Sequence, residues 1–131
     1  MPEPVVFISR FRVKAGMLEA LRRYVADATA AIERDKPGTL VFALYLDEQA
    51  GRLSIVHAFG DSDSMDAHFE GASDRAEAAY EFLQPEGWDV YGAPSGQALA
   101  ALRQAAEKAG VPLRIWPTHV GGFVRAARPA G

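Results

Sequence analysis

Apolar and polar positions alternate along several segments of the chain, and this spacing predicts β-strands. In the first segment, residues 5–13, one face collects Val5, Phe7, Ser9, Phe11 and Val13. Residues 39–46 are apolar on both faces, which is typical of a strand that is covered on both sides. Residues 53–59 follow a polar turn and are expected to pair with them. A shorter fourth strand is predicted at residues 88–91.

Segments with helical spacing separate these strands. Residues 17–34 carry one apolar stripe and end before Pro37-Gly38. A second helix is expected to begin after Asp61, to be interrupted near Gly71, and to resume until Pro85 and Gly87 stop it beyond Leu83. The resulting order, βαββαβ, predicts an α+β fold of the ferredoxin-like kind, an antiparallel sheet with helices on one face.

The residues after this core, 95–131, form an extension of the core at 5–94. Ser95 can cap a helix that stops at Gly110, and residues 113–116 and 120–125 are short strand candidates. The composition never changes to that of a linker. We therefore expect residues 1–131 to form a single domain.

Composition and charge exclude several classes of protein. The chain of 131 residues is 49% hydrophobic and 24% charged, which is ordinary for a globular domain, and its net charge of −3 argues against nucleic-acid binding. The apolar run at residues 5–8 is too short for a signal peptide or a membrane span. Because the chain has no cysteine, a reducing, cytoplasmic location is expected.

The two-sided strand at residues 39–46 predicts a homodimer. One face of this strand carries Leu40, Phe42, Leu44 and Leu46, and the other carries Val41, Ala43 and Tyr45. Two helices can cover only one face of a small sheet, and a second copy of the sheet could cover the other. The alternative is that the helix of the extension covers the second face within one chain.

Four ordered runs resemble the antibiotic biosynthesis monooxygenase superfamily, whose members are dimeric α/β barrels. They are Arg12-Val13-Lys14-Ala15-Gly16, Pro37-Gly38-Thr39-Leu40, Phe59-Gly60-Asp61 and Met65-Asp66-Ala67-His68-Phe69. Residues 121–125 resemble a closing strand of extended members. The resemblance implies the fold and the dimer.

For function, the resemblance implies several alternatives. The superfamily contains oxygenases that act on phenols and quinols without a cofactor, haem-degrading enzymes, and proteins with no known activity. Haem degraders use an Asn, a Trp and a His, at positions that match Ser9, His68 and Ala78 here, and this chain contains no Asn. Haem degradation of that type is therefore not expected, and no cofactor is expected.

Two histidines are the candidate catalytic residues. His68, near the start of the second helix, could take a proton from a phenol, because an imidazole titrates near neutral pH. His57 and Ser9 interrupt apolar strand faces, and we expect them to meet His68 in one pocket. The alternatives are that His68 is a surface or packing residue and that His57 bonds a backbone group in a dry core.

Three further residues are candidates for substrate binding. Arg10 could bind an anionic ligand, or pair with a carboxylate at a dimer interface. Tyr45 and Trp88 could line an aromatic pocket, although large aromatic residues on strands are core residues by default. No metal site is expected, because the three histidines are widely separated and the acids from Asp61 to Asp66 do not fit a calcium loop.

These observations favour a cofactor-independent monooxygenase, or a related small-molecule enzyme, acting on an aromatic or quinol-like substrate. The main alternative is a non-catalytic dimeric protein that binds a small apolar ligand or has a regulatory role. A third is haem binding through His68 or His57 as axial ligand. The sequence leaves open whether the chain is an enzyme.

Overall fold

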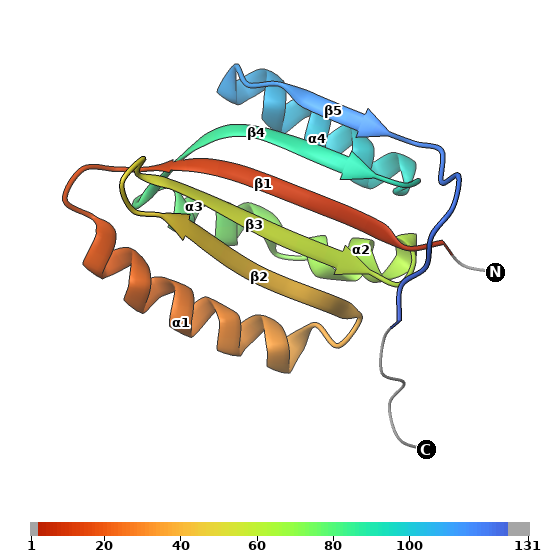
Figure 1. Cartoon of the computed structure of the whole chain (residues 1–131), viewed down its shortest axis with the longest axis horizontal. Coiled ribbons are helices and arrows are strands. Elements are labelled where there is room, and N and C mark those ends of the chain that lie inside the picture. The colour runs from red at the N-terminus through yellow and green to blue at the C-terminus, as the bar shows by residue number, and fades with distance from the viewer. Residues whose placement is uncertain (1–2, 126–131) are drawn as a thin grey trace.

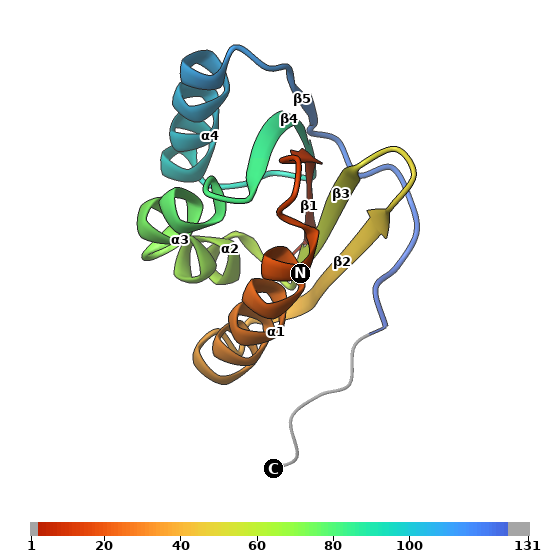
Figure 2. The same ribbon diagram turned by 90° about the vertical axis from the view of Figure 1, so that its left-hand side faces the viewer.

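A computed structural model describes residues 3–125 of the chain. The elements, in order, are β1 (Val5–Val13), α1 (Leu18–Asp35), β2 (Thr39–Asp47), β3 (Arg52–Phe59), α2 (Ser62–Phe69), α3 (Ala72–Ala79), β4 (Leu83–Tyr91), α4 (Gly96–Ala109) and β5 (Leu113–Trp116). The sheet forms one layer and the helices form a second layer on one of its faces (Figures 1 and 2).

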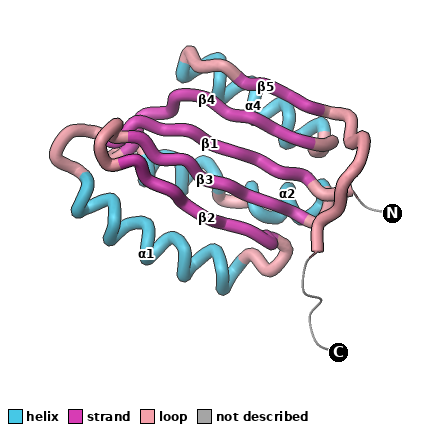
Figure 3. Tube along the Cα trace, in the orientation of Figure 1, coloured by secondary structure: helices cyan, strands magenta, loops and turns pink. Residues whose placement is uncertain are grey.

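Within the described residues the sheet has five strands in the order β2-β3-β1-β4-β5 (Figure 3). β1 is central and pairs antiparallel with both β3 and β4, and β2 pairs antiparallel with β3. This is the predicted ferredoxin-like α+β core. The extension adds α4 to the helical layer and β5 to the edge of β4, where the pairing is parallel.

The predicted helix boundaries have local causes. The Asp61 carboxylate accepts a hydrogen bond from the backbone N–H of Ser64 (2.8 Å), which caps α2. Gly71 separates α2 from α3 with a φ of 78°, a left-handed conformation that glycine adopts without steric cost. Ser95 caps α4 through the N–H of Ala98 (3.0 Å), and Gly110 ends that helix with a φ of 68°.

The prediction for the start of the fourth strand was wrong. β4 begins at Leu83 and contains both Pro85 and Gly87, so the second helical stretch ends at Ala79. Pro85 lies opposite Phe11 of β1, directly beyond a shift of register between Arg10 and Phe11. A proline has no N–H for the ladder, and such an irregularity is where a strand tolerates one.

The prediction of a strand at residues 120–125 was also wrong. These residues are exposed and form no strand in the structure. Gly122 has a φ of 105°, which takes the backbone out of an extended path. The chain after β5 instead runs past the ends of the neighbouring strands at one edge of the molecule (Figure 1).

The buried core lies between the sheet and the helices, in two clusters. The first joins the sheet to α2 and α4 and includes Phe7, Phe59, Met65, Trp88 and Leu102. The second joins the sheet to α1 and consists of Phe11, Leu21, Leu53 and Leu83. No helix in the described part of the chain is long and apolar enough to cross a membrane.

The other face of the sheet has no helix on it (Figure 2). The strand registers place two rows across this open face. One row is Val41, Ala58, Val6, Tyr91 and Trp116, and the next is Ala43, Val56, Ile8, Asp89 and Arg114. Tyr91 and Trp116 stack with ring centroids 5.9 Å apart. The first row is therefore entirely apolar and the second is apolar on β2, β3 and β1, in agreement with the two-sided pattern predicted for residues 39–46.

Candidate functional site

A cavity of about 280 Å³ lies between the sheet and the helices. The helix-side face of β1, β3 and β4 contributes one wall, with Ser9, His57 and Trp88 among mainly apolar neighbours. His68 enters from α2, and the opposite walls come from α1, α3 and α4. The volume is close to the lower end of small-molecule sites, about 300 Å³.

His57 lies on β3 and is held by the backbone of β1. Its Nδ1 lies 3.0 Å from the carbonyl oxygen of Phe7, and its ring stacks on the ring of Phe7 with centroids 4.9 Å apart. Because a carbonyl can only accept, Nδ1 carries the proton and Nε2 is the basic nitrogen. Burial lowers the pKa of His57 from 6.5 to about 4, against the effect of the Phe7 carbonyl, which raises it.

His68 lies on α2 and is only 4% exposed. Its Nδ1 lies 2.7 Å from Oγ1 of Thr39, the first residue of β2. Burial is the main cause that lowers the pKa of His68 from 6.5 to about 3, and repulsion of a charged ring by His57, Arg75 and Lys36 contributes to the same shift. Both imidazoles are therefore neutral near pH 7, and His68 titrates well below the neutral range from which its role as a base was predicted.

The structure brings four of the sequence-predicted site residues to the same cavity: Ser9, His57, His68 and Trp88. Ser9 and Trp88 are direct neighbours across the β1–β4 register, and both are buried. The rings of His57 and His68 meet edge to face, with centroids 5.2 Å apart. The roles of these residues in catalysis or binding stay predictions.

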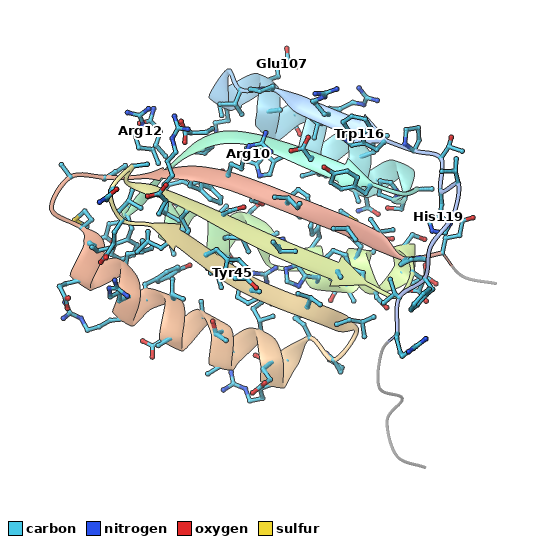
Figure 4. The ribbon with its side chains drawn as sticks, viewed as in Figure 1. Arg10, Arg12, Tyr45, Glu107, Trp116 and His119 are labelled. Carbon is cyan, nitrogen blue, oxygen red and sulfur yellow. The ribbon has the colours of Figure 1, made fainter. Side chains whose placement is uncertain are left out.

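The other two candidates, Arg10 and Tyr45, do not line this cavity. Both lie on the open face of the sheet, where Tyr45 is 64% exposed (Figure 4). Arg10 forms an ion pair with Asp89 of the same chain. The alternation of β1 placed Arg10 on the face opposite Ser9, and the strand registers put Tyr45 on that same face, whereas the cavity lies on the Ser9 side.

Arg75, which the sequence did not single out, lines the cavity from α3. Its guanidinium donates to the backbone carbonyls of Glu70 (2.8 Å) and His68, at the end of α2. Tyr24 of α1, also in the lining, donates its hydroxyl to the carbonyl of Arg75 (3.3 Å). Nothing in the sequence predicted Arg75, because the carbonyls that hold it become available only where α2 ends.

Metal ligands do not gather at this site. Among residues 3–125, no group of three or more His, Cys, Asp or Glu side chains is placed to hold a metal ion. The cavity lining contains the two histidines and Arg75 but no carboxylate. The chemistry that these side chains can perform is proton transfer at imidazole nitrogens beside an apolar surface.

Fold and site together define a small ferredoxin-like α+β protein whose sheet and helices enclose an apolar cavity with two neutral histidines. The family model for antibiotic biosynthesis monooxygenase matches residues 4–81. The chain therefore belongs to the antibiotic biosynthesis monooxygenase family. Among curated proteins, no sequence matches this chain.

Solved structures share the fold at low sequence identity. MupZ from Pseudomonas fluorescens is similar with a TM-score of 0.72 and 16% identity, over 98% of this chain and 99% of that one. SnoaB from Streptomyces nogalater, a cofactor-independent oxygenase, is similar with a TM-score of 0.57 and 20% identity, over 71% of this chain and 95% of that one. Rv0793 from Mycobacterium tuberculosis is similar with a TM-score of 0.55 and 23% identity, over 67% of this chain and 92% of that one. The similarity to MupZ thus includes the region of α4 and β5.

Proposed function

We propose that this protein is a cofactor-independent monooxygenase that oxidises a small phenol- or quinol-type molecule in the cavity between sheet and helices. The observation that carries the proposal is the pair of buried, neutral imidazoles in an otherwise mainly apolar cavity. Membership of the family supports the reaction class, and so does the fold shared with SnoaB.

In this proposal His68 is the general base and His57 and Ser9 orient the substrate. A neutral imidazole removes the phenolic proton, and the electron-rich anion that results can react with dioxygen directly. The apolar walls hold the ring of the substrate in place. His57 Nε2, the basic nitrogen of a ring fixed by Phe7, accepts a hydrogen bond from the substrate.

The reaction balances if the substrate itself supplies all four electrons that dioxygen takes up. A phenol fused to a ring that carries a CH₂ group meets this condition, because the CH₂ group becomes a carbonyl. One oxygen atom forms the new C=O bond, and the other leaves as water with the two hydrogens of the CH₂ group. The proton borrowed by His68 returns to the phenol oxygen of the product, so the base is regenerated.

Oxygen uptake with a panel of such phenols and quinols tests the proposal. We expect uptake with at least one member, and a fall of at least about tenfold in His68→Gln, as for the loss of a general base. His119→Ala is the matched control, since His119 is exposed and outside the cavity. Unchanged rates in His68→Gln would remove His68 from the mechanism. Binding of panel members without any uptake would support the non-catalytic ligand-binding function instead.

We propose further that the open face of the sheet packs against a second copy of the chain. Dimers are typical of this family, and the two rows that include Val6, Ile8 and Val56 lie on the face of the sheet that no helix of the described chain covers (Figure 2). A two-fold axis would place the same rows against each other and bury them in both copies.

A further inference from the structure

His68 separates two hollows of different chemistry. One is the apolar cavity described above. The other is a pocket of about 350 Å³ at the surface, where β2 and α2 begin, and it also has His68 in its wall. Four carboxylates line this outer pocket: Asp35, Asp61, Asp63 and Glu70.

Thr39 lies on the outer side of His68. It lines the outer pocket but not the cavity, and its Oγ1 is 2.7 Å from Nδ1 of His68. The Nδ1 edge of the ring therefore faces the outer pocket through the hydroxyl. A hydroxyl can accept one hydrogen bond while it donates another, and an imidazole can gain a proton at one nitrogen and lose one at the other.

Contacts of the residues just before Thr39 with α2 hold this geometry. Lys36 donates from Nζ to the backbone carbonyls of Ala67 (2.7 Å) and Glu70 (3.2 Å), which ties the entry of β2 to the end of α2. Gly38 comes so close to α2 that an added Cβ would lie 2.9 Å from Cβ of Ser64. The approach of Thr39 to His68 is thus fixed by neighbouring residues on both segments.

The charges around His68 oppose a lasting positive charge on its ring. His57 and Arg75 face it from β3 and α3, and Lys36 faces it from the turn before β2. The outer pocket is lined by four carboxylates and one cation, Lys36, so its net charge is negative and favours positive charge. Its carboxylates are acceptors for a proton that the surroundings of the His68 ring disfavour.

We propose that Thr39 is a positioning residue that relays protons between His68 and the outer pocket. The substrate's O–H proton moves to Nε2, the Nδ1 proton moves to Oγ1, and the hydroxyl proton of Thr39 passes to water in the outer pocket. The same chain returns one proton to the phenol oxygen of the product, so no net proton is consumed. This relay rests on the proposed function for its use in catalysis, while the hydrogen bond between Thr39 and His68 exists without substrate.

The path can be tested without any substrate by measuring, by NMR, the exchange of the His68 ring N–H with water in ¹⁵N-labelled protein. Thr39→Val keeps the side-chain shape and removes the hydroxyl, and Thr39→Ser keeps the hydroxyl. We expect exchange at His68 to slow by at least about tenfold in Thr39→Val, the scale of a lost proton-transfer partner, and to stay near the wild-type rate in Thr39→Ser. The His57 ring, bound to the Phe7 carbonyl, is the internal control. Equal exchange in all three proteins would overturn the relay.

Oxygen uptake then separates this inference from the proposed function. With an active substrate, Thr39→Val should lower kcat and raise the solvent isotope effect while KM stays unchanged, and Thr39→Ser should restore kcat. If exchange at His68 depends on Thr39 but no phenol is oxidised, the path stands and the oxygenase function fails. If uptake needs His68 but neither exchange nor kcat responds to Thr39→Val, the oxygenase function stands and the relay is wrong.

Discussion

The rings of His57 and His68 meet edge to face, with centroids 5.2 Å apart, although one residue comes from β3 and the other from the last turn of α2. Each ring is buried, and protonation of either would place a positive charge beside the other and near Arg75. Both are therefore neutral over a wide range of pH, with consequences for stability as well as for chemistry.

The free energy of unfolding should fall as the pH is lowered below about 6.5. The folded-state pKa values of His57 and His68, about 4 and about 3, lie below the unfolded value of 6.5, so the unfolded chain binds more protons between these limits. The full stability is present above pH 6.5 and is lost progressively down to pH 3–4. One pKa unit corresponds to about 1.4 kcal/mol, so the loss should reach a few kcal/mol.

Urea unfolding between pH 4 and pH 8 measures this loss. His57→Phe should flatten the curve in the acid range, whereas exposed His119→Ala should leave its shape unchanged. A wild-type stability that stays constant from pH 7 to pH 4.5 would contradict the assignment of two buried neutral imidazoles.

The cap of α2 should contribute measurably to stability. Asp61→Ala removes the acceptor for the Ser64 N–H and should lower the free energy of unfolding by about 1 kcal/mol. Asp61→Asn keeps a side-chain oxygen that can accept this hydrogen bond and should keep most of the stability that the cap contributes. Asp63 lies two residues further on, inside the helix, and Asp63→Ala is the matched control. Equal effects of Asp61→Ala and Asp63→Ala in thermal or urea unfolding would show that capping is not the cause.

The close approach of Gly38 to Ser64 predicts a coupled pair of substitutions. Gly38→Ala should destabilise the fold, because the new Cβ would lie 2.8 Å from Oγ and 2.9 Å from Cβ of Ser64, and crowding of this kind costs about 1–3 kcal/mol. The double variant with Ser64→Gly should recover part of the loss. Gly96→Ala, where nothing lies within 4 Å of the added Cβ, should not lower the free energy of unfolding. Additive losses in the double variant would rule out the steric cause.

A charge on the open face of the sheet should disrupt the proposed dimer. Wild-type protein is expected to sediment at twice the chain mass of 14.1 kDa, and Ile8→Arg at the chain mass, because the arginine cannot be buried without a partner. Gln104→Arg adds the same charge on the exposed side of α4 and should leave the dimer intact. A wild-type monomer in analytical ultracentrifugation would show that the open face is not the dimer contact.

Periodicity predicted most of the fold because the residues concerned follow simple rules. The alternation of Val5 to Val13 placed β1 and put Ser9 on the buried face, and the capping residues Asp61 and Ser95 marked the starts of α2 and α4. The error at Pro85 has a physical reason, since a proline is a strand breaker only where its partner strand needs the missing N–H. The register shift between β1 and β4, which leaves Glu86 of β4 without a partner, removes that need, and no local pattern of the sequence indicates it.

The candidate site was predictable only where polar residues interrupt apolar faces. Ser9 and His57 are such interruptions, and they line the cavity together with His68. Thr39 and Arg75 gave no such signal. Thr39 is an ordinary first residue of a strand, and its importance arises from its distance to a histidine 29 residues away. Contacts of this kind depend on the tertiary structure and cannot be read from spacing.

The helix of the extension gives the cavity a wall built largely from small side chains. Ala101 and Ala105 face the hollow from α4, together with Leu102. None of them belongs to the sheet that carries His57 and Ser9. Replacing either alanine by leucine or phenylalanine would shorten the space available to a bound molecule without altering the histidines. Related chains could thus acquire different preferences for the size of their ligand through changes along one helix, while the proton-handling residues stay the same.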